Sequence, residues 1–271
     1  MKRRFALTVC GAALATAFAA GCGAGRSQVP AGTAEADKFL FDRGQEELKE
    51  RNWLRSREFF RQIVENYPQS PFRPDAKIAV GDTYIGEGTT EALLLAVNEF
   101  REFLTFFPTN PRADYAQYRL AFAYSEQMVA PDRDQTATRD TIKELQVFVD
   151  RYPNSALMND ARKLLREARD RLSESSFRVG RTYYRMKWYP GAINRFREVL
   201  KEDPEFTNRD AVYYHLAESL RLSASQKTVS ADDAIKLRAE AVSFYDRLLK
   251  EFEQSEHLEN ARKRIAELKV Q

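Results

Sequence analysis

The sequence predicts an all-α protein, a solenoid of about five helical hairpins closed by a C-terminal capping helix. Its 271 residues include only 11 Gly and 10 Pro, whereas Ala, Glu, Arg and Leu, all good helix formers, dominate the visible runs. From Ala36 onward, amphipathic runs alternate with short breaks, and several breaks contain a proline that would end a helix.

The proline breaks resemble one another and define a repeating frame. They are Tyr67-Pro68-Gln69-Ser70, Phe107-Pro108-Thr109-Asn110, Tyr152-Pro153-Asn154-Ser155 and Asp203-Pro204. Eight residues before each proline stand Phe60, Phe100, Leu145 and Phe196, and twelve before stand Ser56, Ala96, Thr141 and Ala192. A small residue lets paired helices approach closely, and a large one a turn later fills the groove between them. Ser70 and Asn110 are expected to be N-caps, with Pro71 and Pro111 at the first helical position.

The fourth unit follows the frame most clearly. Its spacing is that of the 34-residue tetratricopeptide repeat (TPR), with matching residues Gly180, Tyr183, Tyr189, Ala192, Phe196, Val199 and Pro204. We expect Gly180 on its first helix to face Ala192 on its second.

Other units deviate from a 34-residue period, which predicts insertions at 86–90, 129–138, 156–172 and 223–230. A fifth unit spans 210–252, with Ala217, Ala241 and Tyr245 in the equivalent places. An amphipathic helix at 257–269 would cap the stack and cover its last apolar face. The alternative is a set of unrelated helical hairpins, against which the matched frame argues.

The N-terminus has the layout of an export signal. Lys2-Arg3-Arg4 precedes a run of small and apolar residues, 5–20, which is shorter than the ~20 residues of a membrane span. The run ends in Ala19-Ala20-Gly21-Cys22, which resembles the lipobox of bacterial lipoproteins, although Ala19 replaces the usual Leu. Cleavage would leave Cys22 as a lipidated N-terminus; an ordinary signal peptide with an incidental Cys22 is the alternative.

These features predict a lipoprotein signal peptide at 1–21, a flexible tether at 22–34 after lipidated Cys22, and a TPR-like helical domain at 35–271. Gly23 in place of Asp indicates the outer membrane by the enterobacterial sorting rule, with the domain on its periplasmic face. Cys10 would leave with the signal, so the mature chain would keep one thiol and form no internal disulfide.

The charge balance argues against nucleic acid as a partner. The 43 Lys and Arg residues exceed the 40 Asp and Glu residues by three, and these three are Lys2, Arg3 and Arg4 of the predicted signal. The mature chain would therefore be formally neutral, without the basic footprint that nucleic-acid binding requires.

Few residues could support catalysis or metal binding. The two histidines, His215 and His257, have no partner at ligand spacing and are expected to be structural. Asp132-Arg133-Asp134 resembles the start of a calcium loop, but Ala137 and Lys143 stand where Gly and Glu are needed, so local capping is expected instead. We therefore expect no metal, no cofactor and no enzymatic activity.

Aromatic residues crowd the first one and a half repeats. Most of them should belong to the core, while the remainder could line a concave groove of the kind in which such repeats bind extended peptides. The candidates for this groove are Phe39, Phe41, Trp53 and Tyr84.

Several motifs, in order, resemble the BamD family of lipoproteins of outer-membrane β-barrel assembly. They are Asp114-Tyr115-Ala116-Gln117-Tyr118, then Asp132-Arg133-Asp134, then Arg151-Tyr152-Pro153-Asn154-Ser155 with Asp160-Ala161, and finally Ala192-Ile193-Asn194-Arg195. The resemblance covers roughly residues 36–210, while the fifth unit departs from the family because of its insertion and its missing closing proline.

The resemblance implies a periplasmic scaffold without a catalytic step. It would dock on the periplasmic domain of the β-barrel insertase, join other assembly lipoproteins and help receive unfolded outer-membrane proteins. It also places Asn194 and Arg195 at the surface facing the insertase. The alternative is another TPR lipoprotein adaptor, such as a secretin pilotin or a cell-division coordinator.

Overall fold

The computed structural model describes residues 35–269, which form eleven α-helices and no β-strand. They are α1 (Ala36–Lys49), α2 (Trp53–Asn66), α3 (Arg73–Glu87), α4 (Thr90–Phe106), α5 (Ala113–Ser125), α6 (Thr136–Arg151), α7 (Met158–Arg185), α8 (Tyr189–Glu202), α9 (Arg209–Ala224), α10 (Ala231–Glu251) and α11 (Leu258–Lys269). The predicted signal peptide and tether, with Cys22, lie outside the described residues.

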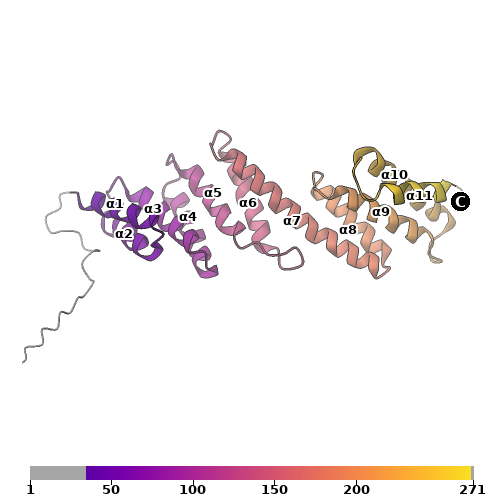
Figure 1. Ribbon diagram of the computed structural model, residues 1–271, viewed down its shortest axis with the longest axis horizontal. Helices are drawn as coiled ribbons and strands as arrows, with labels where there is room; N and C mark the ends of the chain where they lie inside the picture. The colour runs from indigo at the N-terminus through magenta and orange to yellow at the C-terminus, as the bar shows by residue number, and fades with distance from the viewer. Residues whose placement is uncertain (1–34, 270–271) are drawn as a thin grey trace, which may run out of the picture.

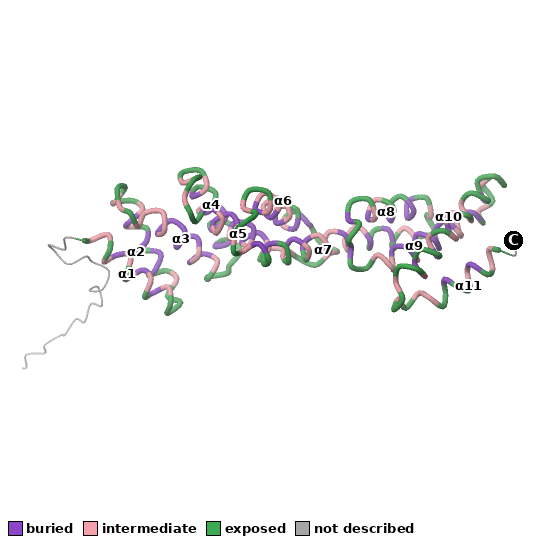
Figure 2. The backbone as a smooth tube through the Cα atoms, turned by 90° about the horizontal axis from the view of Figure 1, so that it is seen from above, coloured by how far each residue is buried: buried purple, intermediate pink, exposed green. Residues whose placement is uncertain are grey.

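The helices stack in chain order into an elongated rod (Figure 1). Each packs chiefly against the next, so the five hairpins are α1–α2, α3–α4, α5–α6, α7–α8 and α9–α10, and α11 covers the last one. Buried backbone runs along the interior of the stack while exposed backbone concentrates at the turns (Figure 2). The predicted fold class, five hairpins with a C-terminal capping helix, is confirmed.

The proline breaks end helices as predicted, but the next helices begin later than expected. The Ser70 hydroxyl accepts a hydrogen bond from the Phe72 amide at 3.1 Å, and the Asn110 side chain accepts one from the Arg112 amide at 2.8 Å. These bonds close a turn two residues ahead, so α3 starts only at Arg73 and α5 at Ala113. The expected N-cap roles of Ser70 and Asn110 are therefore wrong.

The small and large positions of the frame form the core of every proline-bounded hairpin. All eight are fully buried: Ser56, Phe60, Ala96, Phe100, Thr141, Leu145, Ala192 and Phe196. The equivalent residues of the fifth hairpin, Ala217, Ala241 and Tyr245, are buried to the same extent. The frame read from the sequence is thus the packing pattern of the solenoid.

Gly180 makes a different contact from the one expected. A Cβ atom placed there would lie 2.5 Å from the ring of Phe196, whose atoms are the nearest, rather than against Ala192. Gly44 and Gly81 would meet Phe60 and Phe100 in the same way, at 2.7 and 2.6 Å. Gly180 therefore makes room for the ring of Phe196 on the second helix, and Ala192 stands one turn before Phe196 on that helix.

Helix α7 explains the predicted insertion at 156–172. It is 28 residues long, or about 42 Å, and serves two hairpins. Its first half packs Met158, Ala161 and Leu165 against α6, while its second half packs Phe177 in the cluster that includes α8. The core forms three clusters along the rod, and the two halves of α7 belong to two different ones.

Candidate functional site

The four groove candidates in the first two hairpins are not equally accessible. Phe41 stacks on Phe72 with ring centroids 5.0 Å apart, and it also meets the edge of Phe60. Tyr84 is only 4% exposed and lies beneath the guanidinium of Arg57, 3.7 Å from the ring centroid. It therefore offers a ligand little surface.

The other two candidates keep more exposed surface. Phe39 is half-buried on α1, and the half-buried Trp53 lies against Gly86 at the α3 end. Peptide binding at these aromatic residues stays a prediction.

A hydrogen-bonded cluster around one carboxylate, that of Asp82, joins the first helices of the second and third hairpins. Asp82 on α3 accepts hydrogen bonds from the Tyr115 hydroxyl at 2.9 Å and from Arg119 Nε at 2.7 Å, both on α5. Burial raises the pKa of Asp82, although the charge of Arg119 opposes the shift. Burial, together with the negative charge of Asp82, raises the pKa of Tyr115 to about 12. The arrangement is a structural link between helices, which sequence reasoning did not identify.

The family motifs of the third hairpin contact each other. The Ser155 hydroxyl, in the break after α6, donates to Asp114 on α5 at 2.6 Å. The fifth hairpin repeats this link, with the Ser255 hydroxyl donating to Asp210 at 2.7 Å. Motifs that stand about forty residues apart in the sequence therefore form one hydrogen-bonded joint, whose role is to fix the turn to the next helix.

Arg195 and Asn194, the predicted docking residues, lie on α8 outside the core. Arg195 Nη1 donates to Glu198 one turn along the same helix at 2.6 Å, and 35% of the Arg195 side chain is exposed. Asn194 is exposed. Arg197 nearby bridges to Glu240 on α10 at 2.6 Å. The guanidinium of Arg195 is thus at the surface, and its ion pair within the described residues is local.

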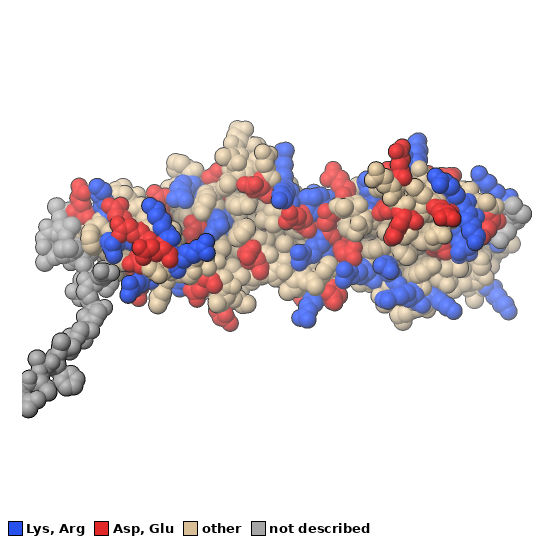
Figure 3. Space-filling model, viewed as in Figure 1, with Lys and Arg blue, Asp and Glu red and all other residues tan. Residues whose placement is uncertain are grey.

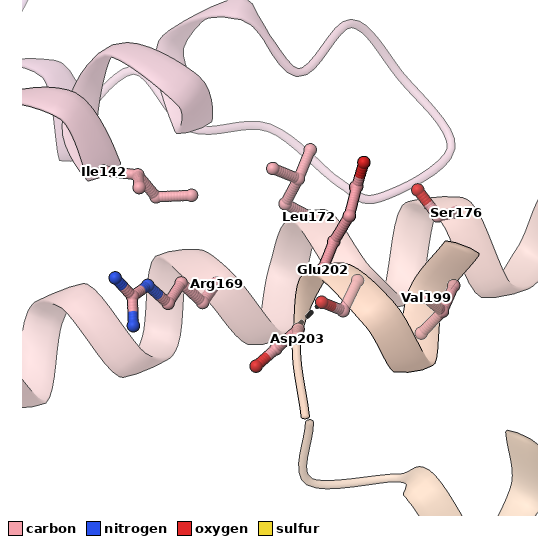
Figure 4. A pocket seen from close by; sticks show the side chains of 8 residues that line it. Ile142, Arg169, Leu172, Ser176, Val199, Glu202 and Asp203 are labelled. Carbon is pink, nitrogen blue, oxygen red and sulfur yellow. Dashed lines mark hydrogen bonds between the residues drawn. The ribbon is translucent and has the colours of Figure 1, made fainter. Parts of the chain in front are cut away.

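A cleft opens where α6 and α8 pack on different halves of α7 (Figure 4). Its volume is about 340 Å³, and it is lined by Ile142, Arg169, Leu172, Ser173, Ser176, Val199, Glu202 and Asp203. Ser173 donates to Asp203 at 2.7 Å, and Arg166 pairs with the same carboxylate. Burial opposes ionisation of Asp203, but these hydrogen bonds outweigh it and lower its pKa. The cleft is therefore lined by an ionised carboxylate, that of Asp203, which Ser173 and Arg166 hold in place.

The C-terminal core contains a buried charged network. Glu218 is 3% exposed and accepts hydrogen bonds from Arg221 at 2.7 Å, from Arg264 at 3.1 Å and from the Tyr245 hydroxyl. Burial of Glu218 favours its neutral form, but these donors prevail and its pKa is lowered. The network ties the capping helix to the fifth hairpin.

His215 lies among aromatic rings beside this network. The rings of Phe177 and Phe196 lie 5.7 and 6.1 Å from it, and Nδ1 is buried without a hydrogen-bond partner. Burial, helped by Arg181 and His257, lowers the pKa of His215 to about 4, and Glu218 opposes this only weakly. The sequence predicts a structural histidine that is half-buried or at the surface, and His215 is half-buried.

A pH dependence of stability follows from His215. Because its pKa is lowered on folding, its contribution is fully present above about pH 6.5 and is lost as the pH falls toward 4. We expect the free energy of unfolding to fall by on the order of 2 kcal/mol over that range. Urea titrations at several pH values would measure it. His215→Gln should flatten the profile, and an unchanged slope in this variant would contradict the assignment.

Other chemistry proposed from sequence patterns has a structural explanation. Asp134 accepts a hydrogen bond from the Thr136 amide at 2.9 Å, which is the local capping expected of this insertion.

Within residues 35–269, no group of three or more His, Cys, Asp or Glu side chains could hold a metal ion. None of the helices in this part of the chain is long and apolar enough to span a bilayer.

Comparison with known proteins decides the family. Residues 33–228 match the family model YfiO, described as an outer membrane lipoprotein. The chain belongs to the YfiO family. The matched range covers the first four hairpins and all of α9, so the resemblance drawn from the motifs is confirmed.

Curated relatives of this YfiO family chain include proteins named outer membrane protein assembly factor BamD. The protein of Caulobacter vibrioides is 30% identical over 211 residues, which cover 77% of this chain and 68% of the relative. That of Neisseria meningitidis serogroup B is 25% identical over 171 residues, or 59% of this chain and 63% of the relative. The chain thus spans about two thirds of the length of these relatives.

Solved structures include a TPR protein from Thermus thermophilus. It is 15% identical, covers 87% of this chain and 100% of its own, and superimposes with a TM-score of 0.36. The assignment of the fold rests on the helical hairpins and their packing frame, and not on this likeness.

Proposed function

We propose that the protein is a scaffold subunit of the machinery that assembles β-barrel proteins in the outer membrane, held on the periplasmic face by a lipid on Cys22 and without an enzymatic step. The observation that carries the proposal is the YfiO family match over residues 33–228, together with relatives named as outer membrane protein assembly factors. It would dock on the periplasmic domain of the insertase, join other assembly lipoproteins and receive unfolded outer-membrane protein segments.

The rod supports this role by offering separate surfaces to separate partners. Its hairpins are joined only to their neighbours, so each presents its own exposed faces. The half-buried aromatic residues of the first hairpin, Phe39, Phe41 and Trp53, are the proposed place for an extended precursor segment. Asn194 and Arg195 on α8 are the proposed contact with the insertase, more than a hundred residues further along the stack.

Arg195 suits an electrostatic contact across an interface. Its guanidinium is at the surface and paired only with Glu198 within the described residues, in an intrahelical pair of the kind that contributes little to stability. A carboxylate on the insertase could replace Glu198 and engage the planar fork with two parallel hydrogen bonds. Exchange of one carboxylate for another would need no rearrangement of the helix.

Arg195→Glu should weaken docking without affecting folding. It replaces attraction by repulsion, and we expect at least a tenfold loss of insertase affinity, about 1.4 kcal/mol or more. The measurement is co-purification of the insertase with the tagged protein at matched expression and melting temperature. Arg43→Glu is the control, because Arg43 forms a similar pair with Glu46 on α1, besides a contact of 3.7 Å with Glu47, and is 30% exposed.

A second variant separates the interface from the helix itself. Glu198→Gln removes the local partner of Arg195 and should leave docking unchanged or strengthen it. Insertase recovery that is undiminished in Arg195→Glu, or equally diminished in Arg43→Glu, would remove Arg195 from the interface.

A further inference from the structure

The tip of the fourth hairpin concentrates positive charge. Residues 175–197 contain six basic residues and no acidic one, although the whole chain is nearly balanced at 43 basic and 40 acidic. The six are Arg178, Arg181, Arg185, Lys187, Arg195 and Arg197. Figure 3 shows Lys and Arg side chains gathered along the lower edge of the molecule, at and beside the end of α7.

Three of these six cations are neutralised by ion pairs and three are not. Arg178 pairs with Glu174 at 2.8 Å, and Arg195 and Arg197 pair with Glu198 and Glu240. Arg181, Arg185 and Lys187 have no carboxylate within 4.0 Å among residues 35–269, and all three are exposed. The uncompensated charge therefore lies on the last turn of α7 and in the turn that follows it.

Large apolar side chains are exposed in the same turn. Met186 is 70% exposed and Trp188 is 54% exposed. Trp188 is held in place, because its ring meets Tyr183 with centroids 4.6 Å apart and lies against the backbone of Gly191. The structure thus fixes an aromatic ring at the surface beside a flexible thioether, instead of burying either. We name Arg181, Arg185, Met186, Lys187 and Trp188 the fourth-hairpin tip.

We propose that the fourth-hairpin tip binds the surface of an anionic phospholipid bilayer. Arg and Lys side chains are attracted to anionic headgroups near the surface, and a Trp ring settles at the boundary between headgroups and acyl chains. Three uncompensated cations with an adjoining Trp and Met match that layered chemistry, and the tip lies at an outer edge of the rod, where a flat surface can reach it (Figure 1).

The contact would orient the rod. The N-terminal end of α1 lies far from the tip along the long axis of the molecule (Figure 1). One attachment near the N-terminus would leave the remaining hairpins free to swing, whereas a second contact at the fourth hairpin would lay the rod along the bilayer. The tip contact alone would be weak and reversible, and it would be strengthened because a lipid on Cys22 holds the tip close to the bilayer at a high effective concentration.

The intrinsic fluorescence of Trp188 tests the proposal directly. The chain has two tryptophans, so the full chain with Trp53→Phe reports Trp188 alone. It is reconstituted in vesicles of phosphatidylcholine mixed with phosphatidylglycerol, whose acyl chains carry bromine as a quencher. We expect a blue shift and quenching of Trp188, both absent in pure phosphatidylcholine and reversed by high salt. Trp188→Phe, which reports Trp53, is the control and should show neither change.

Charge removal supplies the second measurement. In the Trp53→Phe background, the combined changes Arg181→Gln, Arg185→Gln and Lys187→Gln should lower partitioning of the tip into the bilayer by about two orders of magnitude. Helical circular dichroism and the melting temperature check that each variant folds. If Trp53→Phe does not fold, the difference between wild type and Trp188→Phe in the same vesicles gives the Trp188 signal.

The outcomes separate lipid from protein as the occupant. Quenching of Trp188 that depends on phosphatidylglycerol supports the bilayer, and it needs no other subunit, so it stands or falls independently of the proposed role in barrel assembly. Fluorescence of Trp188 that is unchanged by every vesicle, or that shifts only when an insertase domain is added, overturns the proposal and makes the tip a protein contact.

Discussion

Ala192→Glu is expected to destabilise the protein by at least about 4 kcal/mol. Ala192 is fully buried at the small position of the fourth hairpin, one turn before Phe196, whose ring fills the space left by Gly180. A glutamate there would force the helices apart and would bury a carboxylate among apolar side chains, so overpacking and desolvation both act against folding. Urea or thermal unfolding measures the loss.

Lys187→Glu is the matched control for this variant. It introduces the same side chain only five residues earlier, but at an exposed position in the turn between α7 and α8. Its effect on the free energy of unfolding should stay within about 0.5 kcal/mol of zero. Equal melting temperatures for Ala192→Glu and Lys187→Glu would show that the packing frame of the fourth hairpin is wrongly placed.

The frame could be predicted because it depends on local chemistry. Proline breaks a helix beyond its first turn, so Pro68, Pro108, Pro153 and Pro204, each at the end of an amphipathic run, marked the ends of four helices before any packing was known. Small and large residues at constant distances from those prolines then identified the buried face, because a stacked hairpin can bury only one pattern of this kind. The capping helix followed from the same requirement at the last apolar face.

What escaped prediction depends on contacts between distant residues. Ser70 and Asn110 have side chains suited to an N-cap, and only the three-dimensional turn shows that they bond two residues ahead instead. The link from Ser155 to Asp114 spans forty-one residues, and the cleft beside α7 exists because one helix is shared by two hairpins. A periodic pattern carries no signal for the cleft. The link from Ser155 to Asp114 has a counterpart in the link from Ser255 to Asp210, so the aligned serines and aspartates of the third and fifth hairpins were a hint of it.

The predicted docking residue Arg195 lies at the surface, as its role requires, whereas the groove candidate Tyr84 is buried. Ala192, Phe196 and Val199 face inward on α8, so the helical spacing places Arg195 outside the core, where the structure has it. Tyr84 was selected only as one of several crowded aromatics, and its 4% exposure shows why density of aromatic residues in a sequence does not separate core from surface.

Cys22→Ala should release the protein from the membrane fraction. Cys22 is the thiol that would remain after cleavage at 21, and a lipidated cysteine with two or more acyl chains gives stable anchoring at ~0.8 kcal/mol per buried CH₂. Binding of the fourth-hairpin tip to lipid is proposed to be reversible and salt-sensitive, so a high-salt wash should detach any protein that only the tip holds to the membrane.

The measurement is fractionation of cells expressing wild type or Cys22→Ala, with metabolic labelling by a fatty acid. Ser27→Ala, in the predicted tether, is the control and should fractionate as wild type does. Protein that is cleaved, carries Cys22→Ala and stays in washed membranes would show that the anchor is not at Cys22. Uncleaved precursor is recognised by its larger size on a gel, and the comparison of washed membranes is made on the cleaved protein.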